Sequence, residues 1–402
     1  MQLIDPIVQW QTELRQIRRD LHAHPELCFE EHRTADAIAA RLTEWKIPIV
    51  RGLGGTGVLG IIQGNQLEGA HPRSLGLRAD MDALPLQEMN HFPHASTNPG
   101  KMHACGHDGH VTMLLGAARY LAQNRDFAGT VYLIFQPAEE GGGGAKRMMD
   151  DGLFTQYPME AVFGMHNWPG SAVGTFAVTP GSMMASSNEF EVIVHGRGGH
   201  AAEPHKSVDS VMTAVQIAQS WQTIVSRNNN PVDAAVLSIT QIHAGSATNI
   251  LPDDATLIGT VRTFTVPVLD MIERRMREIA EHTAAAFGAQ VEFHFNRNYP
   301  PTINHPKETN FAIQVMRTIV GADQVDTKVE PSMGAEDFSF MLQAVPGCYV
   351  FLGNGEGAHR EQAHGAGPCN LHNPSYDFND ELLPIGATYW VQLARAWLER
   401  TA

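Results

Sequence analysis

Hydrophobic and polar residues follow two different patterns along this chain. In some stretches apolar side chains recur every three to four positions, which predicts amphipathic helices. In others, short β-branched and aromatic runs predict buried strands. The first pattern predicts helices over 7–22, 31–46, 110–121, 144–150, 209–225, 269–287 and 381–400. The second predicts strands over 58–62, 74–79, 129–135, 161–166, 172–178, 188–195, 234–243, 255–265 and 290–295.

The order of these elements changes twice along the chain. Over 1–184 strands alternate with helices, which is typical of an α/β domain with a mainly parallel sheet. The segment 185–297 has the order β-α-β-β-α-β of a ferredoxin-like α+β domain, and 298–402 returns to mixed α/β. We therefore predict one α/β domain with a mainly parallel central sheet, built from the first and last segments and interrupted by the ferredoxin-like insert.

Composition narrows the classes of partner. The chain has 402 residues, 43% hydrophobic and 18% charged, which is typical of a globular protein large enough for two domains. Its net charge of −15 argues against nucleic acid and anionic membranes as partners, and no apolar run approaches a membrane span. The four cysteines are scattered without a disulfide framework, and the N-terminus lacks the pattern of a signal peptide. We therefore expect a cytoplasmic location.

The segment Gly52–Gly57 fits the glycine fingerprint of a dinucleotide-binding site. That fingerprint has to be followed by a helix, whereas 58–62 reads as a strand. We therefore predict a hairpin turn here and no nucleotide cofactor.

Side chains able to bind metal are most concentrated in 102–110, which reads Met-His-Ala-Cys-Gly-His-Asp-Gly-His. Cys105 and His107 are two residues apart, so an extended backbone directs both side chains to one side. They suit two ligands of one metal, or one ligand for each of two neighbouring metals. A thiolate and imidazoles favour zinc or another late first-row ion. The alternative is a histidine-rich surface loop, but the clustering favours metal.

Further candidate ligands follow predicted strands. Glu139 and Glu140 come directly after a core strand, at the edge where open α/β sheets bind ligands. Because adjacent side chains point in different directions, one carboxylate can bind metal while the other transfers protons. A solvated acidic turn is the alternative, although the four glycines that follow argue against it. His166 ends the next strand and His372 lies in a late loop; each is weak evidence alone.

Two aspartates suit supporting roles. Asp82 follows a predicted strand and is suited to hold the second nitrogen of a ligand imidazole, or else to cap the following loop. Asp108 lies at the start of a predicted helix, where it is either an N-cap or a residue behind the metal ligands.

Five motifs then appear in order along nearly the whole chain. They are Arg-Ala-Asp-Met-Asp-Ala-Leu-Pro at 78–85, His-Ala-Cys-Gly-His-Asp-Gly-His at 103–110, Gln-Pro-Ala-Glu-Glu-Gly-Gly at 136–142, Gly-His-Ala-Ala-Glu-Pro-His at 199–205 and Met-Gly-Ala-Glu-Asp-Phe at 333–338. The chain resembles the dinuclear metallo-amidohydrolases of the aminoacylase and carboxypeptidase superfamily. Within it, the chain is similar to the branch of hippurate hydrolases, N-acyl-L-amino-acid amidohydrolases and auxin-conjugate hydrolases.

The resemblance implies two divalent metal ions per subunit, which are zinc, manganese, cobalt or nickel. It implies that the metal ligands are Cys105, His107, Glu140, His166 and His372. It also implies that Glu139 is the catalytic base. Asp80 stands where other branches carry a metal-binding histidine, so we leave it out of the ligand set.

The resemblance further implies that the insert is a lid and often a dimer interface, so we expect a homodimer or homotetramer. His200 is expected to polarise the scissile carbonyl, and in some relatives this histidine comes from the partner subunit. Asn249 and Arg262 match positions that contact the substrate carboxylate or the oxyanion. An ion pair on a strand is the alternative for Arg262. The backbone at Gly334 is expected to line the substrate cleft.

We therefore hypothesise metal-dependent hydrolysis of N-acyl amino acids to a carboxylate and a free amino acid. The alternative is a metallo-carboxypeptidase or dipeptidase that acts on short peptides. A non-catalytic ligand-binding relative is a third reading, which the retained Glu139 argues against. A serine hydrolase is disfavoured because the sequence has no Gly-x-Ser-x-Gly motif.

Overall fold

The computed structural model describes residues 1–66, 73–360 and 362–400, and the chain divides into two compact units. The main unit contains Met1–Gly181, Ile303–Glu330 and Asp337–Ala402. The insert unit contains Ser182–Thr302 and Pro331–Glu336. Each unit has its own hydrophobic core, so each is described by itself.

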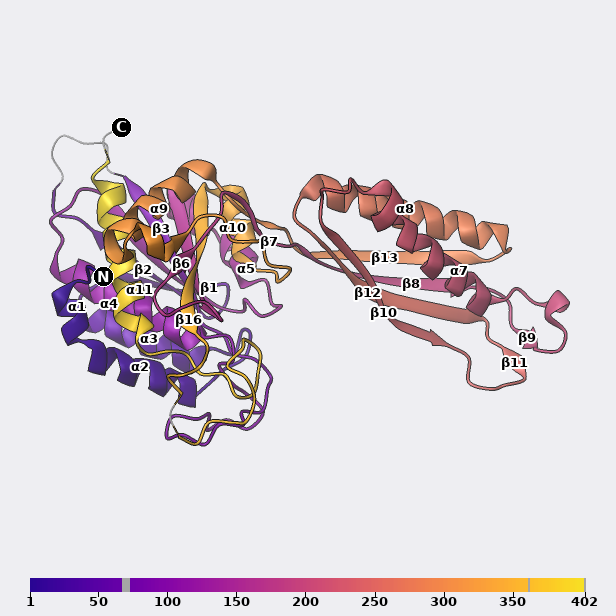
Figure 1. The fold of residues 1–402 in the computed structure, drawn as a ribbon, viewed down its shortest axis with the longest axis horizontal. Coiled ribbons are helices and arrows are strands. Elements are labelled where there is room, and N and C mark those ends of the chain that lie inside the picture. The colour runs from indigo at the N-terminus through magenta and orange to yellow at the C-terminus, as the bar shows by residue number, and fades with distance from the viewer. Residues whose placement is uncertain (67–72, 361, 401–402) are drawn as a thin grey trace. The chain divides into compact units, whose positions relative to one another are not determined.

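The main unit is built on a mixed sheet whose central strands are parallel (Figure 1). Its strands are β1 (Ile49–Leu53), β2 (Gly57–Gln63), β3 (Ser74–Asp80), β4 (Thr130–Gln136), β5 (Ala161–Pro169), β6 (Phe176–Ala177), β15 (Val325–Asp326) and β16 (Gly347–Gly355). The order is β1-β2-β4-β3-β5-β16-β6-β15. The neighbours from β4 to β16 run parallel, whereas β1, β2 and β4 pair antiparallel. The predicted mainly parallel central sheet is confirmed.

Helices pack around this sheet. They are α1 (Asp5–Gln9), α2 (Gln11–Ala23), α3 (His32–Glu44), α4 (His107–Gln123), α5 (Gly144–Asp150), α6 (Leu153–Gln156), α9 (Pro306–Val320), α10 (Phe338–Ala344) and α11 (Leu382–Leu398), with a 3₁₀ turn at Ala322–Gln324. Helices α4 and α11 contact each other and the central strand β3, and α5 and α10 contact each other. Within the described ranges, no helix is both long and apolar enough to span a membrane.

Three element predictions need correction. The helix predicted over 7–22 is two helices, because the backbone at Trp10 leaves the helical conformation. Of the strand predicted over 172–178 only β6 forms, since Gly174 adopts a positive φ of 74° and turns the chain just before it. Helix α4 begins at His107 rather than His110. The predicted hairpin at the glycine fingerprint is confirmed, because β1 and β2 pair antiparallel around this turn.

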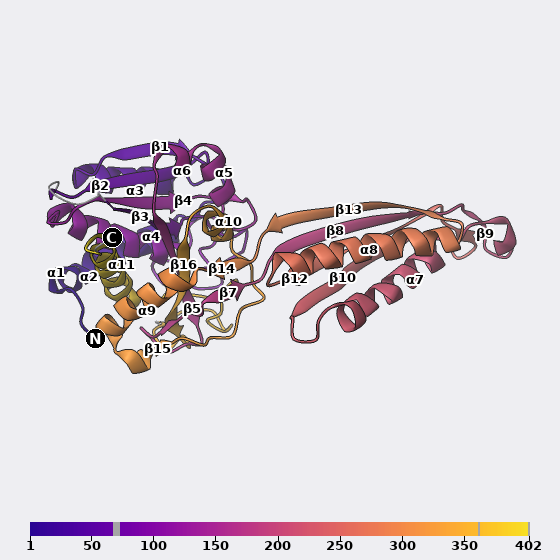
Figure 2. The same cartoon turned by 90° about the horizontal axis from the view of Figure 1, so that it is seen from above.

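The insert unit is a four-stranded antiparallel sheet with two helices on one face (Figure 2). Its main elements are β8 (Ser187–His195), α7 (Ser210–Thr223), β10 (Ala235–Ala244), β12 (Asp254–Thr263), α8 (Val266–Ala286) and β13 (Gln290–Tyr299). Shorter elements are β9 (Gly199–His200), a 3₁₀ turn at Pro204–Lys206, a π-helical turn at Ile224–Asn228 and β11 (Ile250–Leu251). The strand order β10-β12-β8-β13 confirms the ferredoxin-like prediction. Strands β7 (Gly181–Met184) and β14 (Thr302–Asn304) lie where the chain passes between the units.

The parallel part of the main sheet brings three strand ends together. Asp80, the last residue of β3, is in register with Gln136, the last residue of β4. His166 lies in the last part of β5, which also pairs with β3. The carboxyl ends of parallel strands meet at one edge of the sheet, where open α/β folds bind ligands. The fold therefore directs the motifs at 78–85, 103–110 and 136–142 to the same edge.

Candidate metal centre

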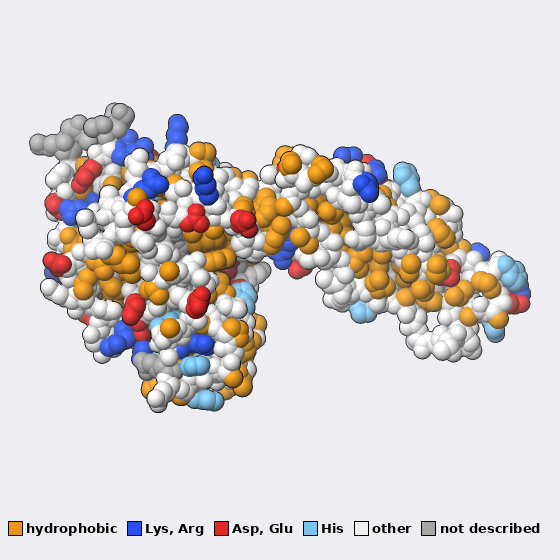
Figure 3. Space-filling view, in the orientation of Figure 1, with side chains coloured by type: hydrophobic (Ala, Val, Ile, Leu, Met, Phe, Trp, Pro, Cys, Tyr) orange, Lys and Arg blue, Asp and Glu red, His pale blue; other side chains and the backbone are white. Residues whose placement is uncertain are grey.

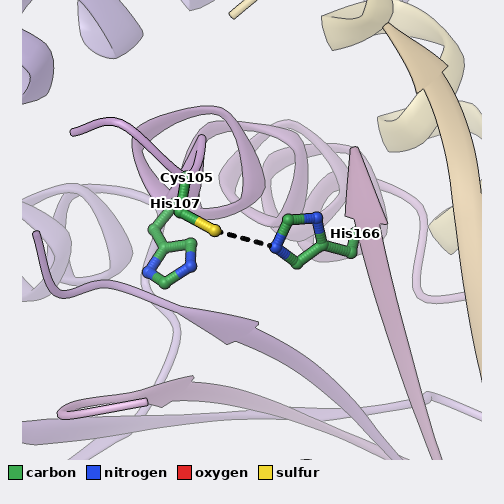
Figure 4. A group of neighbouring side chains, drawn as sticks. All are labelled: Cys105, His107 and His166. Carbon is green, nitrogen blue, oxygen red and sulfur yellow. Dashed lines mark hydrogen bonds between the residues drawn. The ribbon is translucent and has the colours of Figure 1, made fainter. Parts of the chain in front are cut away.

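Three buried side chains form the centre of the candidate site (Figure 4). Cys105 and His107 flank the start of α4, and His166 extends from β5. The Sγ atom of Cys105 lies 3.2 Å from Nε2 of His166. One ligand atom from each of the three residues lies within 4.8 Å of the others, which is close enough to share or bridge cations. The structure therefore brings these three predicted ligands together.

Gly106 allows this arrangement because it has no side chain. Its φ is 95°, and an added Cβ would lie 2.3 Å from Nδ2 of Asn167 and 2.6 Å from the hydroxyl of Tyr376. The same Asn167 amide donates to the carbonyl of Cys105 at 2.6 Å, and the Tyr376 hydroxyl donates to the Asn167 side chain. The backbone between the two candidate ligands is therefore fixed on both sides.

The hydrogen bonds of the two imidazoles determine which nitrogen carries the proton. Nδ1 of His107 lies 2.9 Å from the carbonyl oxygen of Asp82, and Nδ1 of His166 lies 2.6 Å from the carbonyl oxygen of Asn167. Because a carbonyl only accepts, each Nδ1 carries a proton and each neutral ring has its lone pair on Nε2. This is the arrangement found behind metal-binding histidines.

Glu139 and Glu140 follow β4 in a glycine-rich turn. Oε1 of Glu140 lies 3.2 Å from Nε2 of His372 and 4.0 Å from Nε2 of His107. The backbone amide of Glu140 donates to Oδ2 of Asp82 at 2.9 Å. Glu139 is also buried, and its carboxylate reaches the group formed with His107 and Glu140. Two adjacent carboxylates thus face the same imidazole.

His372 returns to this cluster from the end of the chain. Its backbone amide donates to the carbonyl of Ala104 at 2.8 Å, which ties the late loop to the stretch that carries Cys105. Its φ of 60° is rare for a residue with a side chain, and such strained residues concentrate at functional sites. The side chain is 55% exposed, so this ligand candidate faces solvent, whereas Cys105, His107 and His166 are buried and Glu140 is partly buried.

The electrostatics favour positive charge at His107, whereas burial and then His110 lower the pKa of His166 well below its ordinary value. Burial opposes the charged form of His107, but the surrounding carboxylates, with Asp80 first, outweigh it and raise the pKa to about 10. Burial and then the carboxylates of Glu140 and Glu139 raise the pKa of the Cys105 thiol well above its ordinary value. His107 and Cys105 would have to lose these protons to hold a divalent cation, so protons and cations would compete for their Nε2 and Sγ atoms.

The two predicted supporting aspartates lie in different surroundings. Oδ1 of Asp82 is 3.3 Å from Nδ1 of His107, farther than the Asp82 carbonyl, while Oδ2 accepts from Glu140. The interpretation of Asp108 as an N-cap is wrong, because the capping position is Gly106 and Asp108 lies inside α4. Its carboxylate instead lies 2.9 Å from Nδ1 of His22.

The remaining predicted site residues belong to the insert unit. His200 lies on β9 and is in register with Ile250 of β11, and the amide of Ala201 donates to the carbonyl of Asn249. His200 and Asn249 are thus neighbours on adjoining loops of the insert.

Arg262 and Gly334 lie elsewhere in the insert unit. Arg262 is half-buried on β12, where burial lowers the pKa of its guanidinium against the opposing influence of Glu189. This acid is the kind of strand partner that the alternative interpretation requires. Gly334 is exposed, and its carbonyl accepts from the amide of Ala185.

Comparison with known proteins identifies the family. The model of the peptidase family M20/M25/M40 matches residues 76–396. The chain belongs to this family. The predicted relationship to the aminoacylase and carboxypeptidase superfamily is therefore confirmed, and the M20 assignment makes the protein a hydrolase of the amidohydrolase type.

Named relatives match nearly the whole chain. It is 40% identical to the hippurate hydrolase of Campylobacter jejuni over 99% of this chain and 100% of the relative. It is 39% identical to the N-acetylcysteine deacetylase of Bacillus subtilis over 96% of this chain and 97% of the relative. The solved structure of the Bacillus subtilis YXEP protein, a dinuclear metal binding M20 peptidase, is 35% identical with a TM-score of 0.83, covering 98% and 100% of the two chains.

The donor set of this M20 protein fits transition-metal ions. It contains one thiol, carboxylates and imidazoles with their Nε2 atoms directed inward, which is the chemistry that zinc and similar ions prefer. Nε2 of His107 is buried and makes no hydrogen bond among the described residues. A buried polar atom without a partner is costly, and a bound cation removes that cost.

Sequence reasoning missed a second layer of polar residues. His110 donates from Nδ1 to Asp80 at 2.6 Å, and its Nε2 accepts from the amide of Asn167 at 3.0 Å. Arg78 donates to the other oxygen of Asp80 at 2.7 Å. His110 lies in the same motif as Cys105, so its presence there was the available signal.

A buried ion network behind α4 was also missed. Arg18 donates to Asp377 at 2.9 Å and to Asp380 at 2.7 Å, and His22 bridges Asp108 and Glu88. Two polar residues on the core-facing side of α2 were the signal for this network.

Proposed function

We propose that the protein is a metal-dependent amidohydrolase that cleaves N-acyl amino acids into a carboxylate and a free amino acid. The observation that carries the proposal is the buried cluster of thiol, imidazole and carboxylate groups with a second glutamate beside it. The names of the relatives, a hippurate hydrolase and an N-acetylcysteine deacetylase, support the substrate class.

Two divalent ions, zinc, manganese, cobalt or nickel, would be held by one set of side chains. These are Cys105, His107, Glu140, His166 and His372. When bound, such ions lower the pKa of water and polarise a carbonyl oxygen. Asp82 supports two of these residues, because its carbonyl orients His107 and its carboxylate holds the backbone of Glu140. Asp108 supports the start of α4 from behind.

Glu139 is proposed as the base. It directly precedes Glu140 on the turn, is buried, and has a carboxylate oxygen within 4.8 Å of a ring nitrogen of His107. It accepts the proton of the water that attacks the amide carbon and later delivers that proton to the leaving amine. Such acid–base assistance contributes roughly 10²–10⁴-fold to the rate.

The insert is proposed to complete the substrate site. His200 donates a hydrogen bond to the oxygen of the scissile carbonyl as negative charge develops there. Asn249 and Arg262 bind the substrate carboxylate or the same oxygen, and the backbone at Gly334 lines the cleft. In this account the main unit supplies the metal ligands and the base, whereas the insert supplies contacts to the substrate.

A substrate panel tests the proposal. The chelated protein is reloaded separately with zinc, manganese, cobalt or nickel and given hippurate, N-acetyl amino acids, indole-acetyl amino acids and dipeptides. Metal-dependent release of amino acid from the acylated substrates is expected. Activity on dipeptides alone would favour the alternative, a metallo-carboxypeptidase or dipeptidase, which the family name also fits. Binding of two metals without turnover of any substrate would favour a ligand-binding relative.

We also propose that the protein is a cytoplasmic homodimer joined through its insert. The edge strand β10 lies at one end of the insert sheet and leaves Ile242 53% exposed. Met212 and Val215 of α7 are exposed as well, and hydrophobic side chains gather over this helix (Figure 3). An open edge beside apolar side chains is suited to pairing with a second copy. The four free cysteines fit a reducing compartment.

Light scattering after size-exclusion chromatography tests the assembly. We expect a mass twice that of the chain, and a homotetramer would give four times that mass. The substitution Ile242→Glu places a charge on the edge strand and is expected to shift the protein toward monomer. A wild-type monomer at micromolar concentration would contradict this proposal.

A further inference from the structure

The turn that carries the two glutamates begins with a strained residue. Ala138 is fully buried and has a φ of 53°, in the left-handed region that residues with a side chain rarely adopt. It directly precedes Glu139. The torsion angles of Ala138 therefore determine where the Cα atom and side chain of Glu139 point.

The rest of the turn is closed tightly around this residue. The amide of Gly144 donates to the carbonyl of Ala138 at 3.0 Å. An added Cβ on Gly142 would lie 2.7 Å from Cβ of Ala138, and one on Gly144 would lie 1.7 Å from the carbonyl oxygen of Pro137. Glycine is thus needed around Ala138, yet the strained position itself is an alanine.

Three buried or half-buried carboxylates hold the backbone of this turn. The amide of Ala138 donates to Oε1 of Glu31 at 2.9 Å. Asp82 and Asp337 accept from the two later amides, those of residues 140 and 145, each at 2.9 Å. The contact from Glu31 is the one placed before Glu139, whereas the other two lie after it.

Glu31 is itself fixed before it reaches the turn. Its side chain is fully buried, and its Oε2 accepts from the hydroxyl of Thr56 at 2.5 Å. Its backbone carbonyl accepts from Ala35 in the first turn of α3. A carboxylate that is buried and held on one oxygen presents the other oxygen to Ala138 in a defined direction.

We propose that Glu31 is a positioning residue for the proposed base: its carboxylate holds Ala138 in the left-handed conformation and so aims Glu139 at the metal centre. Glu31 touches neither substrate nor metal in this account. The inference rests on the proposed role of Glu139. Without the contact, Ala138 relaxes toward an ordinary backbone conformation and Glu139 moves from its place.

The first test compares variants of Glu31 in the metal-loaded protein. Glu31→Ala and the bulkier Glu31→Met both remove the acceptor, and we expect kcat to fall about 10²-fold, as for a catalytic group misplaced by about 1 Å. KM and the content of two metals per chain are expected to stay near wild type, since Asp82 still holds Glu140. Glu31→Gln keeps an oxygen for the Ala138 amide and is expected to retain most of kcat.

Thr56→Val is the matched control. It removes the other hydrogen bond of Glu31, in the same buried environment, but leaves the contact with Ala138. We expect a lower unfolding midpoint with kcat within about threefold of wild type, because the contact between Glu31 and the Ala138 amide is kept and only the hydrogen bond from the Thr56 hydroxyl is lost. A purely structural role of Glu31 predicts that kcat falls equally in Thr56→Val and Glu31→Met.

The Ala138→Gly background tests whether Glu31 acts on kcat through the backbone conformation of Ala138. Glycine adopts positive φ without strain, so removing Glu31 is expected to cost about tenfold or less in this background, against about 10²-fold in the wild-type background. An equal cost in both backgrounds would overturn the proposal. So would loss of metal, or failure of both Glu31→Ala and Glu31→Met to fold, because Glu31 is then structural.

Glu139→Gln in the same assay distinguishes a failure of the proposed base, Glu139, from a failure of the positioning role of Glu31. If Glu139→Gln keeps wild-type turnover, the proposed base is wrong whatever Glu31 does. If Glu139→Gln is inactive and Glu31→Met is fully active, the positioning role alone is overturned.

Discussion

In the main unit, Cys105, His107 and His166 are buried and Glu140 is partly buried, whereas His372 is exposed. His107 and His166 each donate to a carbonyl, and Glu140 is held through its amide. In the insert unit, His200 lies exposed on a two-residue strand, and its Nδ1 accepts only from the nearby Ala202 amide among the contacts described. The main unit thus fixes His107 and His166 through its core, whereas the insert presents His200 and Asn249 on adjoining loops.

This difference fits separate roles for the two units, with metal binding proposed for the main unit and substrate contacts for the insert. A metal site requires several donors held in fixed positions, and the main unit supplies these from its own strands and turns. A residue that contacts substrate only during the reaction is usefully placed on an element able to move. Substitutions of the candidate ligands in the main unit should therefore change metal content, whereas substitutions of His200 in the insert should change turnover alone.

The largest expected effect comes from removing a buried ligand. His166→Ala should lower metal content and reduce turnover by more than the roughly 10–100-fold typical of an outer-shell change. Elemental analysis and kinetics measure both. His195→Ala, which removes an insert histidine paired with Asp254, is the control and should keep full metal. If His166→Ala kept the metal content of the wild type, the distinction drawn between the two units would be wrong.

The next effect should appear without any loss of metal. His200→Ala is expected to lower kcat by roughly 10²–10³-fold, as for other losses of a donor to a developing oxyanion. His205→Ala removes an exposed histidine of the same loop and should be near wild type. If His200→Ala lost metal, the two units would not divide the work as described.

An intermediate effect is expected at Asp82. Asp82→Asn weakens the acceptor for the Glu140 amide, so metal affinity should fall about 10–100-fold. Titration with a competing chelator measures this. Cys28→Ala is the matched comparison. The Cys28 thiol lies 3.2 Å from the same carboxylate oxygen and 3.2 Å from the backbone carbonyl of Glu140, and its removal leaves the bond from the Glu140 amide to Asp82 in place. Equal losses in the two variants would contradict the role given to Asp82.

The smallest effect on catalysis is expected behind α4. Burial opposes the charged form of His22, but Asp108 and Glu88 outweigh it and raise its pKa to about 10. This folded-state pKa lies above the ordinary value, so the stabilisation is complete below about pH 6.5 and is lost as pH rises toward about 10.

Denaturant unfolding of wild type and His22→Gln measures this stabilisation. The wild type should be more stable by about 1.5–3 kcal/mol near pH 6. The difference should shrink as pH rises from about 6.5 to 10. A difference that does not change with pH would show that His22 is held uncharged.

Much of the fold was predictable because each pattern is local. The alternation along β8 and the spacing along α8 identify the insert elements to within a few residues. The break at Trp10 and the turn at Gly174 were not predicted, since they depend on single backbone conformations.

The site shows the same limit. Cys105, His107 and the paired glutamates are recognisable because their chemistry is concentrated in short motifs. The N-cap alternative for Asp108 was wrong, and the sequence did not indicate its partners Arg18 and His22 because they are distant along the chain. The contact of Glu31 with Ala138 likewise joins residues far apart in the chain. No local sequence pattern predicts a left-handed backbone conformation for an alanine.

The most direct test of the central claim is Glu139→Gln, analysed for metal content and for hydrolysis of N-acyl amino acids in the same preparation. The account predicts two metal ions per chain, as in wild type, with turnover reduced by roughly 10²–10⁴-fold. Wild-type turnover with both metals bound would contradict the assignment of Glu139 as the base and with it the proposed mechanism.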